Sequence, residues 1–298
     1  MTERFCFATR RDFLIGTVAL GIGLATTARA GTDKPHDAIT GLAMLEKKTG
    51  GRLGVSTINT ANGQRIDYRA DERFPLCSTF KLMLVGALLK RSAQDAALMQ
   101  KIVRYDKRAL VDWSPITEQH VGDGMQVNAL CAAALQHSDN TAANLLMKLL
   151  GGPTAVTAYA RSIGNRDFRL DRWETDLNTA IPGDLRDTAT PASMVDSMHA
   201  LTLGSVLPSA QRVQLNDWLL GNTTGGKRIR AGVPPTWQVG DKTGSGDYGT
   251  TNDIGVLRPP GRPAIVVAIY YTHTDAKAPW NDGLIAEAAG IISGAMDE

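Results

Sequence analysis

The pattern of apolar and polar residues changes twice along the chain, from strands to helices and back to strands. Five segments have strand patterns: 52–59, 65–69, 237–242, 252–257 and 264–272. The first two flank an Asn62-Gly63 turn, which is typical of a β-hairpin. The last is almost continuously apolar, as expected for a strand in the middle of a sheet with both faces covered.

Helical patterns fill the middle of the chain and also lie outside the two groups of strands. Apolar residues recur at helical spacing in segments 38–48, 82–89, 127–136, 141–150, 154–163, 192–203, 211–220 and 283–294. Because strands occur at both ends with short connections, we predict an antiparallel sheet built from both ends of the chain.

The predicted fold class is therefore α/β of the α+β type. It has an antiparallel five-stranded sheet, flanked by terminal helices and interrupted by an all-helical insertion. Residues 31–70 together with 221–298 should form the α/β domain, and residues 71–220 the all-α domain. A small-molecule site is expected in a cleft between the sheet and the insertion.

The first thirty residues have the pattern of an export signal. Residues 9–14 contain the twin Arg10-Arg11, an apolar run of 13 residues follows at 13–25, and Ala28-Arg29-Ala30 offers a cleavage site. The run is too short to span a bilayer, which takes about 20 residues. We therefore predict a twin-arginine-type signal peptide at 1–30, a periplasmic mature protein and no membrane association after its removal.

Charge and cysteine content limit the partners. The leader holds four arginines and two acidic residues, so the formal net charge of +2 becomes zero without it. A nucleic-acid partner is therefore not expected, and the protein should be a monomer. The histidines show no ligand spacing, so we expect neither a metal nor another cofactor. Export with one possible pair suggests a disulfide between Cys77 and Cys131, but twin-arginine export carries proteins folded in a reducing compartment. Two buried free thiols are favoured, and the pairing stays open.

The first candidate for chemistry is Ser78, which precedes Lys81 by three residues in Cys-Ser-Thr-Phe-Lys. A helix beginning near Ser78 would put both side chains on one face. A serine hydroxyl needs a base within reach, and a lysine serves when burial lowers its pKa. The segment after Lys81 is apolar, which favours such burial over a solvated lysine.

Three further segments add polar groups. Ser138-Asp139-Asn140 separates two helices, and either Asp139 or Asn140 should cap the second one. Lys242-Thr243-Gly244-Ser245-Gly246 ends a strand and suits a substrate carboxylate, although a plain Gly-rich turn has the same pattern. Glu174 and Asn178 lie in a long stretch without periodicity, which is usually functional in a compact domain; Arg172 and Asp187 could pair to pin its ends.

Together, Ser-x-x-Lys, Ser-Asp-Asn, Glu-x-x-x-Asn and Lys-Thr-Gly occur in this order at Ser78, Ser138, Glu174 and Lys242. This set resembles the class A serine β-lactamases over essentially the whole mature chain. The resemblance implies hydrolysis of the amide bond of small-molecule β-lactam antibiotics through an acyl-enzyme on Ser78. Lys81 would activate Ser78, directly or through Glu174 and a water, and Ser138 would protonate the lactam nitrogen. Glu174, with Asn178, would activate the deacylating water.

The resemblance also implies the substrate-binding residues. Asn140 would bind Lys81 and the substrate's acylamide oxygen. The substrate carboxylate would be bound by Lys242, Thr243 and Ser245, with Arg228 as a distal helper. Trp113 would flank the mouth of the cleft, unless it is a core tryptophan.

One departure concerns the carbapenem-hydrolysing subgroup. In some of its members the cysteine before the nucleophile is tied to a cysteine where this chain has Gly246, so Cys77 lacks that partner. Trp113, Trp173 and Arg228 nevertheless resemble the subgroup. The sequence therefore leaves open the ranking of penicillins, cephalosporins and carbapenems. The alternatives are a penicillin-binding transpeptidase or carboxypeptidase, which lacks the glutamate, and a β-lactam sensor module, which needs a membrane-spanning segment.

Overall fold

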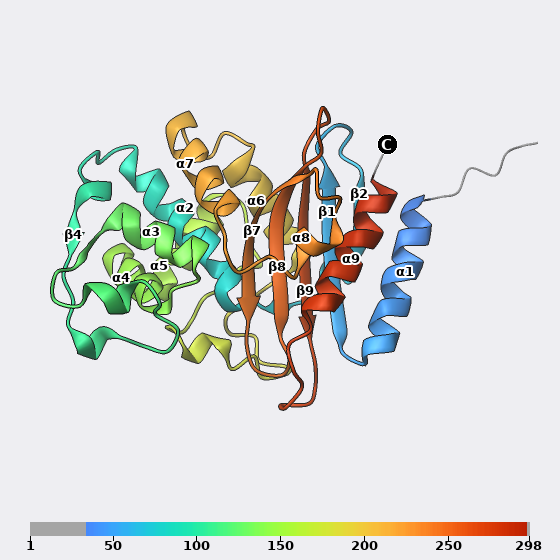
Figure 1. The fold of residues 1–298 in the computed structure, drawn as a ribbon, viewed down its shortest axis with the longest axis horizontal. Coiled ribbons are helices and arrows are strands. Elements are labelled where there is room, and N and C mark those ends of the chain that lie inside the picture. Colours follow the sequence, from blue (N-terminus) through green and yellow to red (C-terminus); the bar gives the residue numbers. More distant parts are fainter. Residues whose placement is uncertain (1–33, 297–298) are drawn as a thin grey trace, which may run out of the picture. The chain divides into compact units, whose positions relative to one another are not determined.

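One antiparallel sheet is built from both ends of the chain. The computed structural model describes residues 34–296, so the predicted signal peptide lies outside the described residues. In that range the large sheet has five strands in the order β2-β1-β9-β8-β7 (Figure 1). They are β1 (Arg52–Asn59), β2 (Arg65–Tyr68), β7 (Gln238–Ser245), β8 (Thr251–Arg258) and β9 (Ile265–Thr272). Strand β1 pairs with β9 over its full length, which confirms the predicted sheet.

The central position of strand β9, with both of its faces covered, explains its continuous apolar pattern. Successive side chains of a strand point to opposite faces, and both faces of this one are covered. Ile265, Val267, Ile269 and Tyr271 belong to the core on one face, whereas Val266, Ala268 and Tyr270 belong to the core on the other. The whole strand is buried as a result, and it lies third among the five strands, as its composition predicts.

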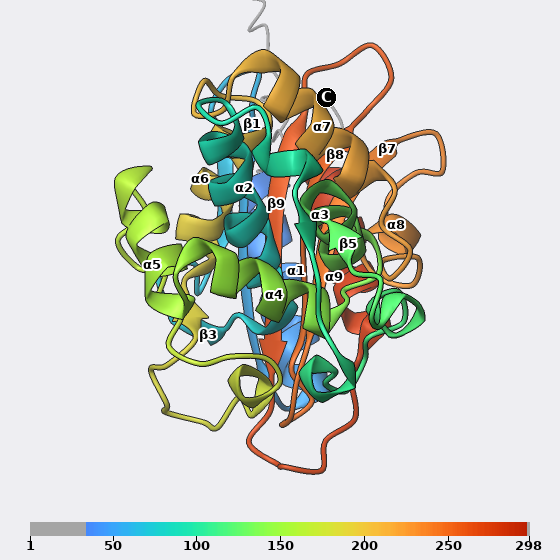
Figure 2. The same cartoon turned by 90° about the vertical axis from the view of Figure 1, so that its left-hand side faces the viewer.

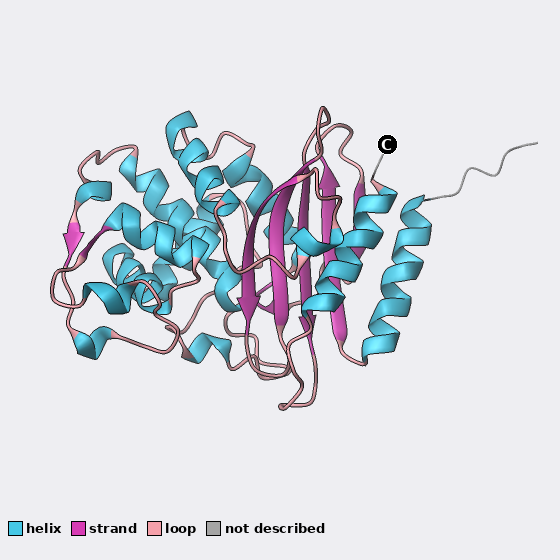
Figure 3. Ribbon diagram, in the orientation of Figure 1, coloured by secondary structure: helices cyan, strands magenta, loops and turns pink. Residues whose placement is uncertain are grey.

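Helices cover the two faces of the sheet unequally (Figures 2 and 3). The helices on one side are α1 (Lys34–Thr49), α8 (Ile229–Gly232) and α9 (Asp282–Ala295), and both α1 and α8 pack on α9. Those on the other side are α2 (Lys81–Ser92), α3 (Val127–Gln136), α4 (Asn140–Leu150), α5 (Pro153–Ser162), α6 (Pro191–Thr202) and α7 (Ser209–Leu220). Of these, α6 contacts β1 and β9, and α7 contacts β7. None of the helices in residues 34–296 is long and apolar enough to cross a bilayer.

Some short elements were not predicted. Strand β3 (Phe74–Pro75) pairs with β6 (Thr188–Ala189), and β4 (Ile102–Val103) pairs with β5 (Met125–Gln126). The 3₁₀ turns are η1 (Cys77–Phe80), η2 (Leu98–Gln100), η3 (Lys107–Ala109), η4 (Thr117–His120) and η5 (Asp176–Asn178). Elements of two to four residues contain only one or two periods of a hydrophobic pattern, too few for periodicity to reveal them.

Two apolar cores lie on the two faces of the sheet, but the described residues belong to a single compact unit. The division into an α/β domain (31–70 and 221–298) and an all-α domain (71–220) therefore stays a prediction. Cys77 and Cys131 are both buried and unpaired, as favoured from the sequence.

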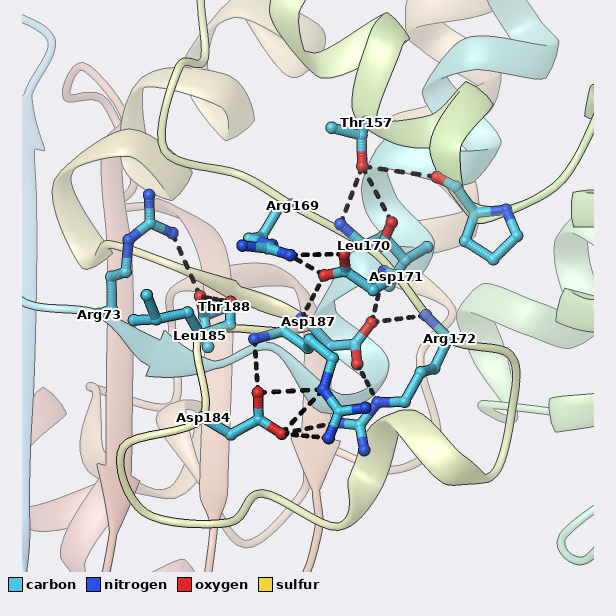
Figure 4. A network of polar contacts seen from close by, with 12 residues as sticks. Arg73, Thr157, Arg169, Leu170, Asp171, Arg172, Asp184, Leu185, Asp187 and Thr188 are labelled. Atoms are coloured by element: carbon cyan, nitrogen blue, oxygen red, sulfur yellow. Dashed lines mark hydrogen bonds and ion pairs between the residues drawn. The ribbon is translucent and has the colours of Figure 1, made fainter.

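The buried carboxylate of Asp187 joins the two ends of the long segment between α5 and α6 (Figure 4). Asp187 accepts hydrogen bonds from the backbone N–H groups of Asp171 (2.7 Å) and Arg172 (2.9 Å) and from the guanidinium Nε of Arg172 (2.5 Å). Its own N–H donates to the carboxylate of Asp171 at 3.1 Å. The predicted Arg172–Asp187 pair is confirmed, and it joins the two ends of the loop that carries Glu174.

We expect Asp187→Ala to lower the free energy of unfolding by about 3 kcal/mol, because it removes one partner of a buried ion pair and leaves backbone donors unsatisfied. Urea unfolding measures this loss. Asp176→Ala is the control, since it removes an exposed carboxylate from the same loop, and exposed charges contribute at most about 1 kcal/mol. Equal losses of the free energy of unfolding in the two variants would show that Asp187 does not specifically stabilise the junction between the two ends of this loop.

Candidate active site

Ser78 lies in η1, at the junction between the short strand β3 and helix α2. The sequence predicted a helix beginning near Ser78. Ser78 lies in the 3₁₀ helix η1, which continues directly into α2 at Lys81. The three-residue spacing still brings the two side chains together, because Lys81 Nζ donates to Ser78 Oγ at 2.9 Å. Both residues are buried.

Lys81 is completely buried and is surrounded by oxygen atoms. Besides Ser78, its Nζ donates to the carbonyl oxygen of Ser138 (2.9 Å) and to Oδ1 of Asn140 (2.6 Å), and it forms an ion pair with Oε1 of Glu174 at 2.9 Å. Burial lowers the pKa of the Lys81 ammonium, and the Glu174 carboxylate opposes that shift. The charge is therefore held against desolvation by the neighbouring Ser78 and by groups from two other segments, the Ser138–Asn140 turn and the loop at Glu174.

Glu174 is held by both its backbone and its carboxylate. Its N–H donates to Oδ1 of Asn144 (3.0 Å), and its carbonyl oxygen accepts from Nδ2 of the same residue (2.9 Å). The Nδ2 of Asn178 donates to Oε2 of Glu174 at 2.6 Å, and Oε1 lies 3.4 Å from Ser78 Oγ. Asn144 was missed in the sequence, although it follows Asn140 by four residues and so lies on the same face of α4.

Ser138 lies between two lysines. It occupies the turn between α3 and α4 with a left-handed φ of 56°, and Asp139 caps α4, as one of the two predicted candidates. Ser138 Oγ accepts from Nζ of Lys242 at 3.0 Å and from Nζ of Lys81 at 3.5 Å. Burial lowers the pKa of the Lys242 ammonium well below its usual value, and the nearby charge of Lys81 lowers it further.

Lys242, Thr243 and Ser245 lie inside β7, which continues three residues beyond its predicted end. Buried Arg228 donates to Ser245 Oγ at 2.7 Å and to the carbonyl oxygen of Gly244 at 2.8 Å. Lys242, Thr243, Ser245 and Arg228 are called the β7 wall below. Two contacts of this wall were not predicted. Arg228 Nε pairs with Asp282 Oδ1 at 2.7 Å, and Thr224 Oγ1 lies 2.5 Å from Thr243 Oγ1.

The remaining predicted residues lie on the helical side of the site. Asn140 accepts from Lys81 through Oδ1, and its Nδ2 donates to the carbonyl oxygen of Asp112. Trp113 is 65% exposed, so it is not a core tryptophan. Its backbone carbonyl accepts from the N–H of Asn140, and its indole Nε1 donates to the carbonyl oxygen of His137.

The position of Gly246 bears on the missing cysteine partner. A Cβ atom on Gly246 would lie 2.7 Å from Sγ of Cys77 and 2.5 Å from the carbonyl oxygen of Asn178. The two positions are therefore in direct contact, but this chain has no thiol at the second one. Burial raises the pKa of the Cys77 thiol, which makes it a poor nucleophile.

Taken together, the site contains a hydroxyl in contact with a buried ammonium–carboxylate pair, next to a second hydroxyl and a cationic wall. This arrangement can activate a serine nucleophile and bind an anionic substrate beside it. The structure brings together all eleven residues predicted from the sequence: Ser78, Lys81, Ser138, Glu174, Asn140, Asn178, Lys242, Thr243, Ser245, Trp113 and Arg228.

Comparisons with known proteins agree with this geometry. Residues 35–296 match the model of the β-lactamase enzyme family. β-Lactamase OXY-2 of Klebsiella oxytoca is 53% identical over 89% of this chain and 90% of its own. The carbapenem-hydrolysing β-lactamase KPC of the same organism is 54% identical over 84% of this chain and 85% of its own. β-Lactamase CTX-M-25 of Escherichia coli is 49% identical over 96% of this chain and 98% of its own.

A solved structure gives the same result for the fold. The β-lactamase of Desulfarculus baarsii is 51% identical, covers 90% of this chain and all of its own, and superposes with a TM-score of 0.88. The family match, these identities and the serine–lysine–glutamate site agree, and the chain belongs to the β-lactamase enzyme family as a class A serine β-lactamase.

Proposed function

We propose that this protein hydrolyses the amide bond of β-lactam antibiotics through an acyl-enzyme on Ser78, which water activated by Glu174 then releases. The observation that carries the proposal is the position of the Glu174 carboxylate, 3.4 Å from Ser78 Oγ. Asn144 holds the glutamate's backbone and Asn178 its other oxygen. A carboxylate fixed in this way beside an acylated serine is suited to general-base work on water.

In the acylation step, Ser78 Oγ attacks the lactam carbonyl carbon and its proton passes to the Lys81–Glu174 pair. Lys81 is 2.9 Å and Glu174 is 3.4 Å from that oxygen, so the proton can pass to Glu174 directly, or to Lys81 after Lys81 has protonated Glu174. Both routes leave one additional proton on the pair. The lactam C–N bond then breaks, and its nitrogen takes a proton from Ser138. Lys81, whose Nζ lies 3.5 Å from Ser138 Oγ, returns a proton to that hydroxyl, so the additional proton leaves the Lys81–Glu174 pair and Glu174 is again a carboxylate before deacylation.

Binding rests on the β7 wall and on Asn140. Arg228 donates to the hydroxyl of Ser245, and Lys242 donates to the backbone carbonyl oxygen of Thr243 and to the hydroxyl of Ser138. The two cations and the hydroxyl groups of Thr243 and Ser245 form a donor set that suits the carboxylate of a β-lactam. Asn140 is assigned to the acylamide oxygen of the substrate. Trp113 flanks the cleft mouth, and its exposed indole offers an apolar surface there.

In the deacylation step, water attacks the ester carbonyl carbon, Glu174 takes the water proton, and Ser78 Oγ leaves with a proton from the Lys81–Glu174 pair. Among residues 34–296, the buried Oδ1 of Asn178 accepts no hydrogen bond from the protein. A water between Asn178 Oδ1 and the Glu174 carboxylate would have two acceptors for its protons, which turns a lone pair toward the ester.

Two alternatives use part of the same site. A transpeptidase or carboxypeptidase would share the serine, lysine and Lys-Thr-Gly groups, and a sensor module would acylate once. Neither needs a carboxylate held at the nucleophile, and this chain devotes both Asn144 and Asn178 to that carboxylate. Hydrolysis is therefore the function that the geometry supports best.

The setting of the enzyme is part of the proposal. The twin arginines and the cleavage site support export by the twin-arginine route to the periplasm, where the mature chain acts as a monomer on small-molecule β-lactams. Free buried Cys77 and Cys131 agree with folding in a reducing compartment before export.

Removal of the proposed deacylation base should trap the intermediate. We expect Glu174→Ala to slow deacylation by a factor on the order of 10²–10⁴, so that mass spectrometry after mixing with benzylpenicillin detects a stable adduct on Ser78. Asp176→Ala, which removes an exposed carboxylate from the same loop, is the matched control and should turn over normally. Unchanged turnover by Glu174→Ala would exclude Glu174 as the base.

Removal of the nucleophile should abolish both steps. Ser78→Ala is expected to form no adduct and to hydrolyse no β-lactam, because no other hydroxyl has both Lys81 and Glu174 within reach among the described residues. Steady-state hydrolysis and mass spectrometry test this, with a thermal unfolding curve to verify folding. Residual burst kinetics in this variant would contradict the covalent route through Ser78.

Export is tested in cells. Replacement of Arg10 and Arg11 by lysine should retain the precursor in the cytoplasm and remove hydrolysis from the periplasmic fraction, because paired arginines are the recognised feature of the leader. Arg4→Lys, which leaves the pair intact, is the control. Normal periplasmic activity of the double variant would contradict the twin-arginine route.

A further inference from the structure

Trp280 is an exposed aromatic residue attached to the proposed binding wall. It lies between β9 and α9, and 63% of its surface is exposed. Its indole Nε1 donates to the carbonyl oxygen of Gly246 at 2.9 Å. Gly246 directly follows Ser245, so the indole is fixed within one residue of the strand end that borders the nucleophile.

The segment around Trp280 is fixed to the same wall at two more points. The N–H of Asn281 donates to Oγ1 of Thr251 at 3.0 Å, and Asp282 pairs with Arg228 at 2.7 Å. Thr251 lies opposite Ser245 in the β7–β8 register. Three successive residues therefore hold this segment against the ends of β7 and β8, so the exposed indole is positioned rather than loosely attached.

Trp113 has a matching arrangement on the helical side of the site. It is 65% exposed, and its indole donates to the carbonyl oxygen of His137, the residue before Ser138. Ser138 is in turn bonded to Lys242 of β7 at 3.0 Å. Each indole is thus fixed by a backbone carbonyl next to a serine of the site, one on the helical layer and one on the sheet. A fixed aromatic side chain loses little conformational entropy when a ligand covers it.

The end of β7 has no apolar side chain of its own. Gly244, Ser245 and Gly246 succeed one another there, and Gly246 has no room for a Cβ because Cys77 and the carbonyl oxygen of Asn178 are in the way. The N–H of the next residue, Asp247, donates to the same Asn178 oxygen at 2.9 Å. Apolar surface beside this strand end therefore comes from residues beyond it, and Trp280 is an exposed one that is hydrogen-bonded to Gly246.

We propose that Trp280 is a specificity-determining residue that contacts the acylamido side chain of the substrate and favours aryl and heteroaryl groups there. The inference rests on the proposed function. With the substrate carboxylate at Lys242 and the reacting carbonyl at Ser78, the side chain next to that carbonyl extends past Ser245 toward Gly246. An aryl group at this position meets the indole, and aromatic pairs are favourable beyond the area that they bury.

The test compares two penicillins that differ only in this side chain: benzylpenicillin, which has a phenylacetyl group, and 6-aminopenicillanic acid, which has none. We expect Trp280→Ala to lower kcat/KM for benzylpenicillin by about tenfold and to leave 6-aminopenicillanic acid within about twofold. Trp280→Phe keeps an aromatic surface without the indole N–H and should retain most of the preference. Met44→Ala, an exposed apolar residue on α1, is the control.

Two outcomes would overturn the inference. Equal losses for both penicillins would mean that Trp280 only fixes Gly246 and the strand end, and unchanged values for both would mean that no side chain contacts it. Failure of the proposed function is distinct, because the unmodified enzyme would then turn over neither penicillin. In that event the rate of adduct formation on Ser78 is measured for both penicillins with the unmodified enzyme and with the same variants. An absent adduct, or a ratio of the two penicillins' rates that Trp280→Ala leaves unchanged, also overturns the inference.

Discussion

The buried ammonium of Lys81 is the charge on which the rest of the site depends. Taking an ion of this size out of water costs several kcal/mol, and only close partners offset that cost. Here the partners come from two other segments, the Ser138–Asn140 turn at the start of α4 and the loop at Glu174. Because one charge needs both, neither segment can move away from α2 without exposing or isolating that charge. The interaction that activates the nucleophile therefore also holds the site together.

The loop that carries Glu174 is fixed by the same principle at a second place. Where the two ends of the loop meet, Asp187 accepts hydrogen bonds from backbone N–H groups and pairs with Arg172, two residues before Glu174. Asn144 then fixes the backbone of Glu174 on the side facing α4. A long loop without regular structure would otherwise place a carboxylate poorly, since each flexible residue adds freedom. Buried polar contacts replace the hydrogen bonds that a helix or strand would supply.

Much of the fold and the main site residues could be predicted from the sequence, for reasons that differ from element to element. Strand β9 and helix α3 have complete hydrophobic periods, and Ser78 and Lys81 are brought together by spacing alone. The end of β7 was predicted too early, because Thr243, Gly244 and Ser245 resemble a turn; only pairing with β8 keeps them in the strand. Asp282, Thr224 and Trp280 could not be predicted, since their partners lie far away in sequence and no local pattern indicates such contacts.

The position of Ser138 links the two layers electrostatically. Its hydroxyl accepts from Lys242 on the sheet and lies 3.5 Å from Lys81 on the helical side. Burial lowers the pKa of both ammonium groups, and for Lys242 the charge of Lys81 adds to that shift. A substrate carboxylate arriving beside Lys242 adds a negative charge there, and it stabilises the Lys242 ammonium. The Lys242 ammonium keeps its hydrogen bond to Ser138 Oγ and stabilises the negative charge that develops there as Ser138 gives its proton to the lactam nitrogen. Recognition of the carboxylate and cleavage of the ring are therefore coupled through one hydroxyl.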